Sequence, residues 1–212
     1  MNDRAYWERH ARRYDASLRL VLGGPIPRML ELTSEAVREC GRVLEVAAGT
    51  GLVTTAIARS AKTVIATDYA NSMVEILNKR VTETGLSNVT CEQADLYTLR
   101  FGQAEFDAVV AANVLHLVPD LAGALAAFRH VLKPGGRLIV PTFCHDETVV
   151  SRTISRALAI TGFPAQRRFS AKSLRAAMQL ADLRVSHFET LPGVIPIGYA
   201  EGTFAMAANQ TT

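Results

Sequence analysis

The sequence feature that most constrains the fold is an apolar run that breaks abruptly into small residues. Residues 42–46 read RVLEV and are followed by AAGTG at 47–51 and then by a helical pattern. This order predicts a buried strand, a tight turn and the start of a helix. Glycines let the backbone approach a bound molecule closely, and free N–H groups at a helix start face the same point. The stretch therefore favours a nucleotide-binding turn.

Strand-like and helical patterns alternate after this turn. We expect helices at 52–60, 72–84 and 120–132, and strands at 63–68, 88–95, 106–114 and 137–143. This alternation predicts a mostly parallel α/β sheet with helices on both faces. The rhythm changes beyond residue 143, where we expect helices at 148–161 and 171–181 and sheet-edge strands at 183–190 and 203–208. Before the turn, an amphipathic basic helix is expected at 3–22 and a second helix at 26–39.

The length of 212 residues and a hydrophobic fraction of 49% suit a single domain with a sizeable core. We divide it into an N-terminal helical lid or cap (1–40), a core (41–143) and substrate-side helices with the last strands (144–212). The net charge of +3 is too small to indicate nucleic-acid binding. No basic segment followed by an apolar block opens the chain, and the three cysteines lack metal-ligand spacing. We therefore expect a soluble, cytoplasmic protein.

Neighbouring residues decide which nucleotide the turn could bind. A dinucleotide fingerprint needs a third small residue where this chain has Thr54, and no Gly-Lys-Ser/Thr of a P-loop follows. Glu45 inside the apolar run needs a partner for its carboxylate, and a cationic ligand could supply one. A nicotinamide-dependent oxidoreductase is therefore disfavoured.

Five short motifs follow one another in this part of the chain. They are EVAAGTG at 45–51, TD at 67–68, ADL at 94–96, FDAVV at 106–110 with LH at 115–116, and LKPGGRL at 132–138. Between about residues 40 and 143 the chain thus resembles the class I S-adenosylmethionine-dependent methyltransferases, and most of all their small quinone-biosynthesis-like branch. The resemblance implies a Rossmann-like, doubly wound sheet of seven strands in the order 3-2-1-4-5-7-6, with strand seven antiparallel.

The resemblance also implies S-adenosylmethionine as the cofactor, with S-adenosylhomocysteine as product. Asp68 is expected to accept the ribose hydroxyls, Asp95 the adenine amino group, and the Asn113 carbonyl the ammonium group. Ala47 stands where the family usually has glycine. The complete implied cofactor site is Glu45, Ala47, Gly49, Thr50, Gly51, Asp68, Tyr69, Met73, Asp95, Leu96, Asn113, Val114 and Tyr14.

Methyl transfer from a sulfonium does not require a base, but a histidine could remove the acceptor's proton. His116, after the fourth strand, is the first candidate, and His145, after the fifth, is the second; each could instead be a structural histidine. No metal is expected. The acceptor is a small molecule whose identity and methylated atom (O, C or N) stay open, as does the oligomeric state. One alternative is a phospholipid or lipid-surface methyltransferase, suggested by the basic residues between 152 and 175, although a solvated basic face is the favoured explanation of these residues. The other is a non-catalytic S-adenosylmethionine-binding module.

Overall fold

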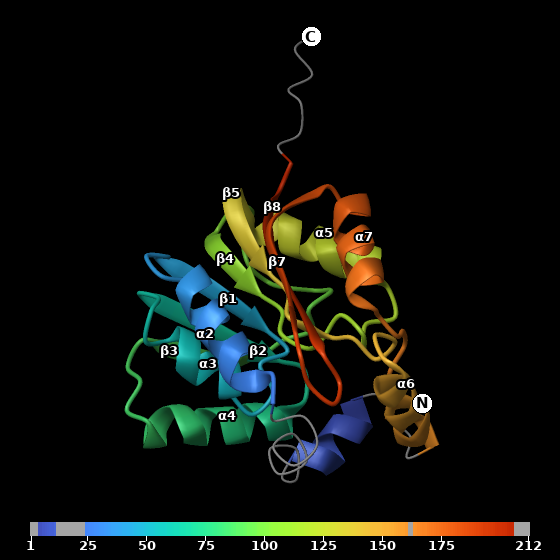
Figure 1. Ribbon diagram of the computed structural model, residues 1–212. Helices are drawn as coiled ribbons and strands as arrows, with labels where there is room; N and C mark the ends of the chain where they lie inside the picture. The colour runs from blue at the N-terminus through green and yellow to red at the C-terminus, as the bar shows by residue number, and fades with distance from the viewer. Residues whose placement is uncertain (1–3, 12–23, 161–162, 206–212) are drawn as a thin grey trace.

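The computed structural model describes residues 4–11, 24–160 and 163–205 (Figure 1). Residues 4–11 form a short helix at the N-terminal end. Further helices are α2 (Ile26–Ala36), α3 (Leu52–Ile57), α4 (Asn71–Glu83), α5 (Leu121–Val131), α6 (Val149–Ile160) and α7 (Ala171–Leu180). The strands are β1 (Arg42–Val46), β2 (Thr63–Asp68), β3 (Val89–Gln93), β4 (Phe106–Val110), β5 (Leu132–Ile139), β6 (Thr142–Phe143), β7 (Leu183–Leu191) and β8 (Ile197–Phe204).

The strands form one sheet in the order β3-β2-β1-β4-β5-β8-β6, and β7 also pairs with β8. The strands from β3 to β5 run parallel, whereas β8 is antiparallel to β5, β6 and β7. The predicted sixth and seventh strands correspond to β7 and β8. The Rossmann-like order with one antiparallel strand is therefore confirmed, and the short β6 is an addition at the end of the predicted fifth strand.

Two helical layers cover the sheet because successive residues of its strands point to opposite faces. Val43 of β1 packs in a core cluster that contains buried residues of α2, α3 and α4. Leu44 and Val46 pack on the other face with residues of α5 and α7. Glu45 consequently faces the layer of α2, α3 and α4. This places its carboxyl inside the protein, below the turn that follows β1.

The bounds expected for the last strand, 203–208, are wrong, because β8 spans Ile197–Phe204; residues 206–208 lie outside the described residues. The expected strand bounds, 183–190 and 203–208, leave Gly198 and Gly202 in the connection, whereas the structure places both inside β8. In the structure, a Cβ on Gly202 would overlap the backbone of Arg184 in β7, and one on Gly198 would lie 2.8 Å from Cδ2 of Leu174. Neighbouring elements approach these positions so closely that glycine is required inside the strand.

The predicted helices agree with α2 to α7, within a few residues at their ends. The helix expected at 3–22 is confirmed for residues 4–11, and the rest of it lies outside the described residues. The strand expected at 106–114 ends at Val110, so that residues 111–118 form a loop at the carboxyl edge of the sheet. Within the described part of the chain, no helix has both the length and the apolar character needed to cross a bilayer.

Candidate functional site

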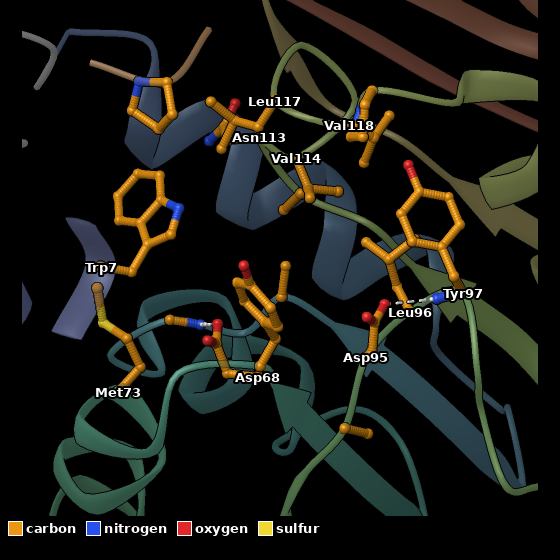
Figure 2. A pocket seen from close by; sticks show the side chains of 17 residues that line it. Trp7, Asp68, Met73, Asp95, Leu96, Tyr97, Asn113, Val114, Leu117 and Val118 are labelled. Atoms are coloured by element: carbon orange, nitrogen blue, oxygen red, sulfur yellow. Dashed lines mark hydrogen bonds between the residues drawn. The ribbon is translucent and has the colours of Figure 1, made fainter. Parts of the chain in front are cut away.

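A cavity lies at the carboxyl edge of the sheet, where ligands bind in doubly wound folds (Figure 2). It is bounded by the turn after β1, the end of β2, the segment after β3 and the loop after β4. The cavity brings together nine of the predicted cofactor residues: Ala47, Gly49, Asp68, Tyr69, Met73, Asp95, Leu96, Asn113 and Val114. Side chains that sequence reasoning did not assign to the site also line it: Trp7, Tyr97, Leu117, Val118, Pro119 and Pro164.

The turn after β1 has left-handed backbone at three positions. The φ angles are 52° at Ala47, 57° at Gly49 and 86° at Gly51. Left-handed backbone costs an alanine about 1–2 kcal/mol, which explains why a glycine suits position 47. Gly51 has a different role, because a Cβ there would lie 2.5 Å from Cδ1 of Leu77 in α4. Thr50 and Gly51 do not line the cavity, and Gly51 allows α4 to pack against the turn.

Asp68 ends β2, and its carboxylate ties the two neighbouring turns together. Oδ2 accepts a hydrogen bond from the backbone N–H of Gly49 at 2.8 Å, and Oδ1 accepts one from that of Ala70 at 2.9 Å. Burial raises the pKa of Asp68, and the hydrogen bonds from Ala70 and Gly49 partly offset this effect. Each carboxylate oxygen can accept a second hydrogen bond. The side chain, which lines the cavity, therefore retains capacity for a diol such as that of a ribose.

Asp95 contributes a second carboxylate to the cavity. Its Oδ1 accepts a hydrogen bond from the backbone N–H of Tyr97 at 2.9 Å, which orients the exposed side chain. Figure 2 shows Asp68 and Asp95 on one side of the cavity, with Val114 and Val118 facing them from the other. Two acceptors that face an apolar wall match the hydroxyls, the amino group and the flat faces of an adenosine.

Glu45 is buried and does not line the cavity. Its Oε2 accepts a hydrogen bond from Oγ1 of Thr54 in α3 at 2.6 Å. Burial raises the pKa of Glu45 from 4.5 to about 8, with a smaller opposing effect of the Thr54 hydrogen bond and a further increase from Asp68. The partner of this carboxyl in the structure is therefore Thr54, rather than a cationic ligand. Thr54, the residue that disfavours a dinucleotide, is itself fully buried.

The helix at 4–11 closes one side of the cavity with Trp7. Glu8 holds this helix at the start of α4, where its carboxylate accepts hydrogen bonds from the backbone N–H groups of Asn71 at 2.7 Å and Ser72 at 2.9 Å. A hydrogen bond with the Ser72 side chain and these backbone bonds lower the pKa of Glu8. The sequence around α4 does not indicate that Glu8, 63 residues earlier in the chain, caps the start of this helix. Tyr14, predicted to contact the cofactor, lies outside the described residues.

The two candidate bases, His116 and His145, lie together but do not line the cavity. Their ring centroids are 5.0 Å apart, and their side chains are almost fully buried. Nδ1 of His145 is 2.6 Å from Oγ of Ser155 in α6. Burial lowers the pKa of His116, and it lowers that of His145 to about 4, with a contribution from Arg168. Both rings are therefore neutral at pH 7.

Comparisons with known proteins agree with this geometry. The family model described as a methyltransferase domain matches residues 44–140. The chain is 31% identical to the ubiquinone/menaquinone biosynthesis C-methyltransferase UbiE of Marinomonas sp. (strain MWYL1), over 87% of this chain and 77% of the relative. It is 36% identical to the ubiquinone biosynthesis O-methyltransferase of Xylella fastidiosa (strain 9a5c), over 64% of this chain and 53% of that relative. The latter match thus spans about half of the relative's length.

A solved structure shares the fold. A SAM-dependent methyltransferase from Aquifex aeolicus superimposes with a TM-score of 0.70 at 18% identity, over 92% of this chain and 98% of that one. The motifs of residues 45–138, the strand order and the relatives together bear out the predicted cofactor, S-adenosylmethionine. The chain therefore belongs to the class I S-adenosylmethionine-dependent methyltransferases, in their quinone-biosynthesis, UbiE-like branch.

Proposed function

We propose that this protein transfers the methyl group of S-adenosylmethionine to a ring carbon or a hydroxyl oxygen of a small quinone-related acceptor. The observation that carries the proposal is the convergence of the 47–49 turn, Asp68 and Asp95 on one cavity at the carboxyl edge of the sheet. The acceptor class is supported by the names of the relatives, which describe C- and O-methylation in quinone biosynthesis.

The side chains of the cavity divide the work of holding the cofactor. Asp68 accepts the ribose hydroxyls in addition to the N–H groups of Gly49 and Ala70. Asp95 accepts the adenine amino group, and Val114 packs against the adenine face. Ala47 and Gly49 leave room for the methionine part, whose ammonium donates to the main-chain carbonyl of Asn113.

S-adenosylmethionine supplies a methyl group that its sulfonium centre already activates. The contribution of the protein is then mainly to align the acceptor with that group and to exclude water. Trp7, Leu117 and Val118 form an apolar wall around the cavity and are suited to the second task. The helix at 4–11 helps to retain the ligand in this scheme, because its Trp7 forms part of the wall.

The test is the formation of S-adenosylhomocysteine by the purified chain with a panel of acceptors. The panel contains a naphthoquinol with an unsubstituted ring carbon, a catechol, and vesicles of phosphatidylethanolamine. We expect product with the hydroxylated rings and none with the vesicles. Tight binding of S-adenosylhomocysteine without turnover of any acceptor would instead indicate a non-catalytic module. Turnover confined to the vesicles would indicate a phospholipid methyltransferase.

A further inference from the structure

Buried polar atoms without a partner gather beside the cofactor cavity. Among the described residues, three buried side-chain atoms lack a hydrogen bond: Oδ1 of Asn113, Nδ1 of His116 and Nε2 of His145. All three belong to the segments that follow β4 and β5, which are neighbouring strands. Leaving such an atom unsatisfied is unfavourable, so buried polar groups in folded proteins nearly always have a partner. A polar ligand that reaches these atoms would remove this cost.

The two histidines are enclosed by aromatic rings. The ring of Phe163 stacks on His116 with centroids 6.1 Å apart and planes 19° apart, and the Phe143 ring lies 6.1 Å from His116 and 6.2 Å from His145. Phe163 is also 6.1 Å from Trp7, which lines the cofactor cavity. The enclosure therefore borders the cavity, with Phe163 between the two. The Phe143 and Phe163 rings give this enclosure flat, apolar walls, against which the flat ring of an aromatic acceptor can pack.

The hydrogen bond between His145 and Ser155 occupies Nδ1 of His145 and leaves its Nε2 without a partner. The Ser155 hydroxyl lies 3.5 Å from the backbone oxygen of His145, to which it can donate while it accepts the Nδ1 hydrogen at 2.6 Å. Nε2 of His145 then carries a lone pair. His116 is also neutral at pH 7, and its Nδ1 can carry the hydrogen. One acceptor and one donor of hydrogen bonds thus lie side by side.

We propose that His116 and His145 form the acceptor's hydroxyl-binding site, in which a ring hydroxyl donates to Nε2 of His145 and accepts from Nδ1 of His116. A hydroxyl fits because it satisfies both nitrogens at once, whereas a quinone carbonyl can only accept. The acceptor reaches the pair when the half-buried ring of Phe163 turns aside. This inference rests on the proposed function, and it assigns the chemical class of the acceptor to an ionisable hydroxyl on a flat ring.

The two histidines have different roles in the reaction. An electron pair on the acceptor's hydroxyl oxygen or ring carbon forms the new bond to the methyl carbon. As this bond forms, the hydroxyl proton passes to Nε2 of His145. The bond between that carbon and sulfur breaks with its electrons going to sulfur, so that S-adenosylhomocysteine and a protonated His145 result. His145 is thus the catalytic base, and His116 holds the hydroxyl oxygen.

Binding is tested with a pair of probes that differ only in the hydroxyl groups. 1,4-Dihydroxynaphthalene, kept reduced, and 1,4-dimethoxynaphthalene are added separately to the protein saturated with S-adenosylhomocysteine. Ring ¹⁵N resonances of the histidines are recorded, and single variants assign them. We expect the dihydroxy probe to shift the resonances of His116 and His145, and the dimethoxy probe to leave them in place. Equal responses to both probes, or no response to either, would overturn the hydroxyl-binding site.

Kinetics separate the two histidines. His145→Gln is expected to lower kcat by about 10²–10⁴-fold with little change in KM, as for loss of a general base. His116→Leu is expected to raise the KM for the acceptor by about tenfold, because it removes the hydrogen bond to the hydroxyl oxygen. His116→Asn is expected to restore this KM, because its amide can donate that hydrogen bond. His187→Gln, on β7, is the matched control and should retain full turnover. Turnover by His145→Gln within threefold of the wild type would contradict the assignment.

Two controls keep this test separate from that of the proposed function. Calorimetric affinity for S-adenosylhomocysteine must be the same in every variant, which shows that each one is folded; if His116→Leu does not fold, His116→Asn and the ¹⁵N shifts carry the test. If the wild type methylates no hydroxylated ring, the proposed function fails, while the ¹⁵N shifts still decide whether the pair binds a hydroxyl. If the wild type methylates naphthoquinol and His145→Gln does so equally well, only the histidine site fails.

Discussion

Replacing the buried Glu45 by glutamine should change the pH dependence of stability in a defined direction. The carboxyl has a pKa of about 8 in the folded protein against an ordinary value of 4.5. Below pH 4.5 it is protonated in both the folded and the unfolded state, so it adds no pH dependence. As the pH rises toward 8, the unfolded chain releases the proton and the folded chain keeps it. The free energy of unfolding of the wild type therefore falls through this range and levels off above it.

The size of the effect follows from the same shift. Each pKa unit corresponds to about 1.4 kcal/mol. The change in pKa from 4.5 to about 8 therefore lowers the free energy of unfolding by at most about 5 kcal/mol between low and high pH. Glu45→Gln removes the titration and keeps an oxygen that can accept from Thr54. Burying the N–H groups of the amide costs about 1–3 kcal/mol at every pH. The variant should thus be less stable than the wild type near pH 5 and more stable near pH 8.5.

Urea unfolding followed by far-ultraviolet circular dichroism at pH 5, 6, 7, 8 and 8.5 measures this crossover. The matched control is Glu92→Gln, at an exposed position on β3. A difference between Glu45→Gln and the wild type that stays constant from pH 5 to 8.5 would refute the reasoning, because it would mean that Glu45 does not bind a proton on folding.

Three further predictions concern the turn and the helix at 4–11. Gly51→Ala should lower the free energy of unfolding by about 2–4 kcal/mol. The control is Gly85→Ala, which should lower it by only about 1–2 kcal/mol, because the φ there is also positive but no atom lies within 4 Å of the new Cβ. Equal losses in the two variants would argue against the clash with Leu77. Ala47→Gly should raise the melting temperature, since it relieves left-handed backbone at 52°, and should not weaken binding of S-adenosylhomocysteine; a lower melting temperature would contradict this. Glu8→Ala should speed the dissociation of S-adenosylhomocysteine in stopped-flow experiments, because the helix that carries Trp7 loses its bonds to α4; an unchanged rate would show that this helix does not retain the ligand.

The parts of the site that the sequence predicts are those encoded by neighbouring residues. The small residues follow β1 directly, Asp68 is the last residue of β2, and Asp95 comes two residues after the end of β3. Parallel strands bring their carboxyl ends to one edge of the sheet. Asp68, Asp95 and Gly49 line the cavity for this reason. The strand order follows in the same way, because the alternation of strands and helices limits the possible connections.

The parts that the sequence does not predict depend on contacts between distant segments. Glu8 caps α4 across 63 residues, and Phe163 meets both Trp7 and His116. Glu45 and Thr54 were each recognised as unusual, yet their hydrogen bond becomes visible only once α3 is packed below the turn. The start of β8 was missed because local rules treat glycine as a strand breaker, whereas here close neighbours require it.

We expect the cavity beside Asp68 to bind the S-adenosyl group. Isothermal titration calorimetry with S-adenosylhomocysteine, on the wild type and on Asp68→Ala, tests it most directly, with circular dichroism to verify that the variant is folded. We predict saturable binding to the wild type and a loss of about tenfold to a hundredfold in Asp68→Ala, since hydrogen bonds to a charged group contribute about 1.5–3 kcal/mol. No binding to the wild type, or undiminished affinity in Asp68→Ala, would contradict the account.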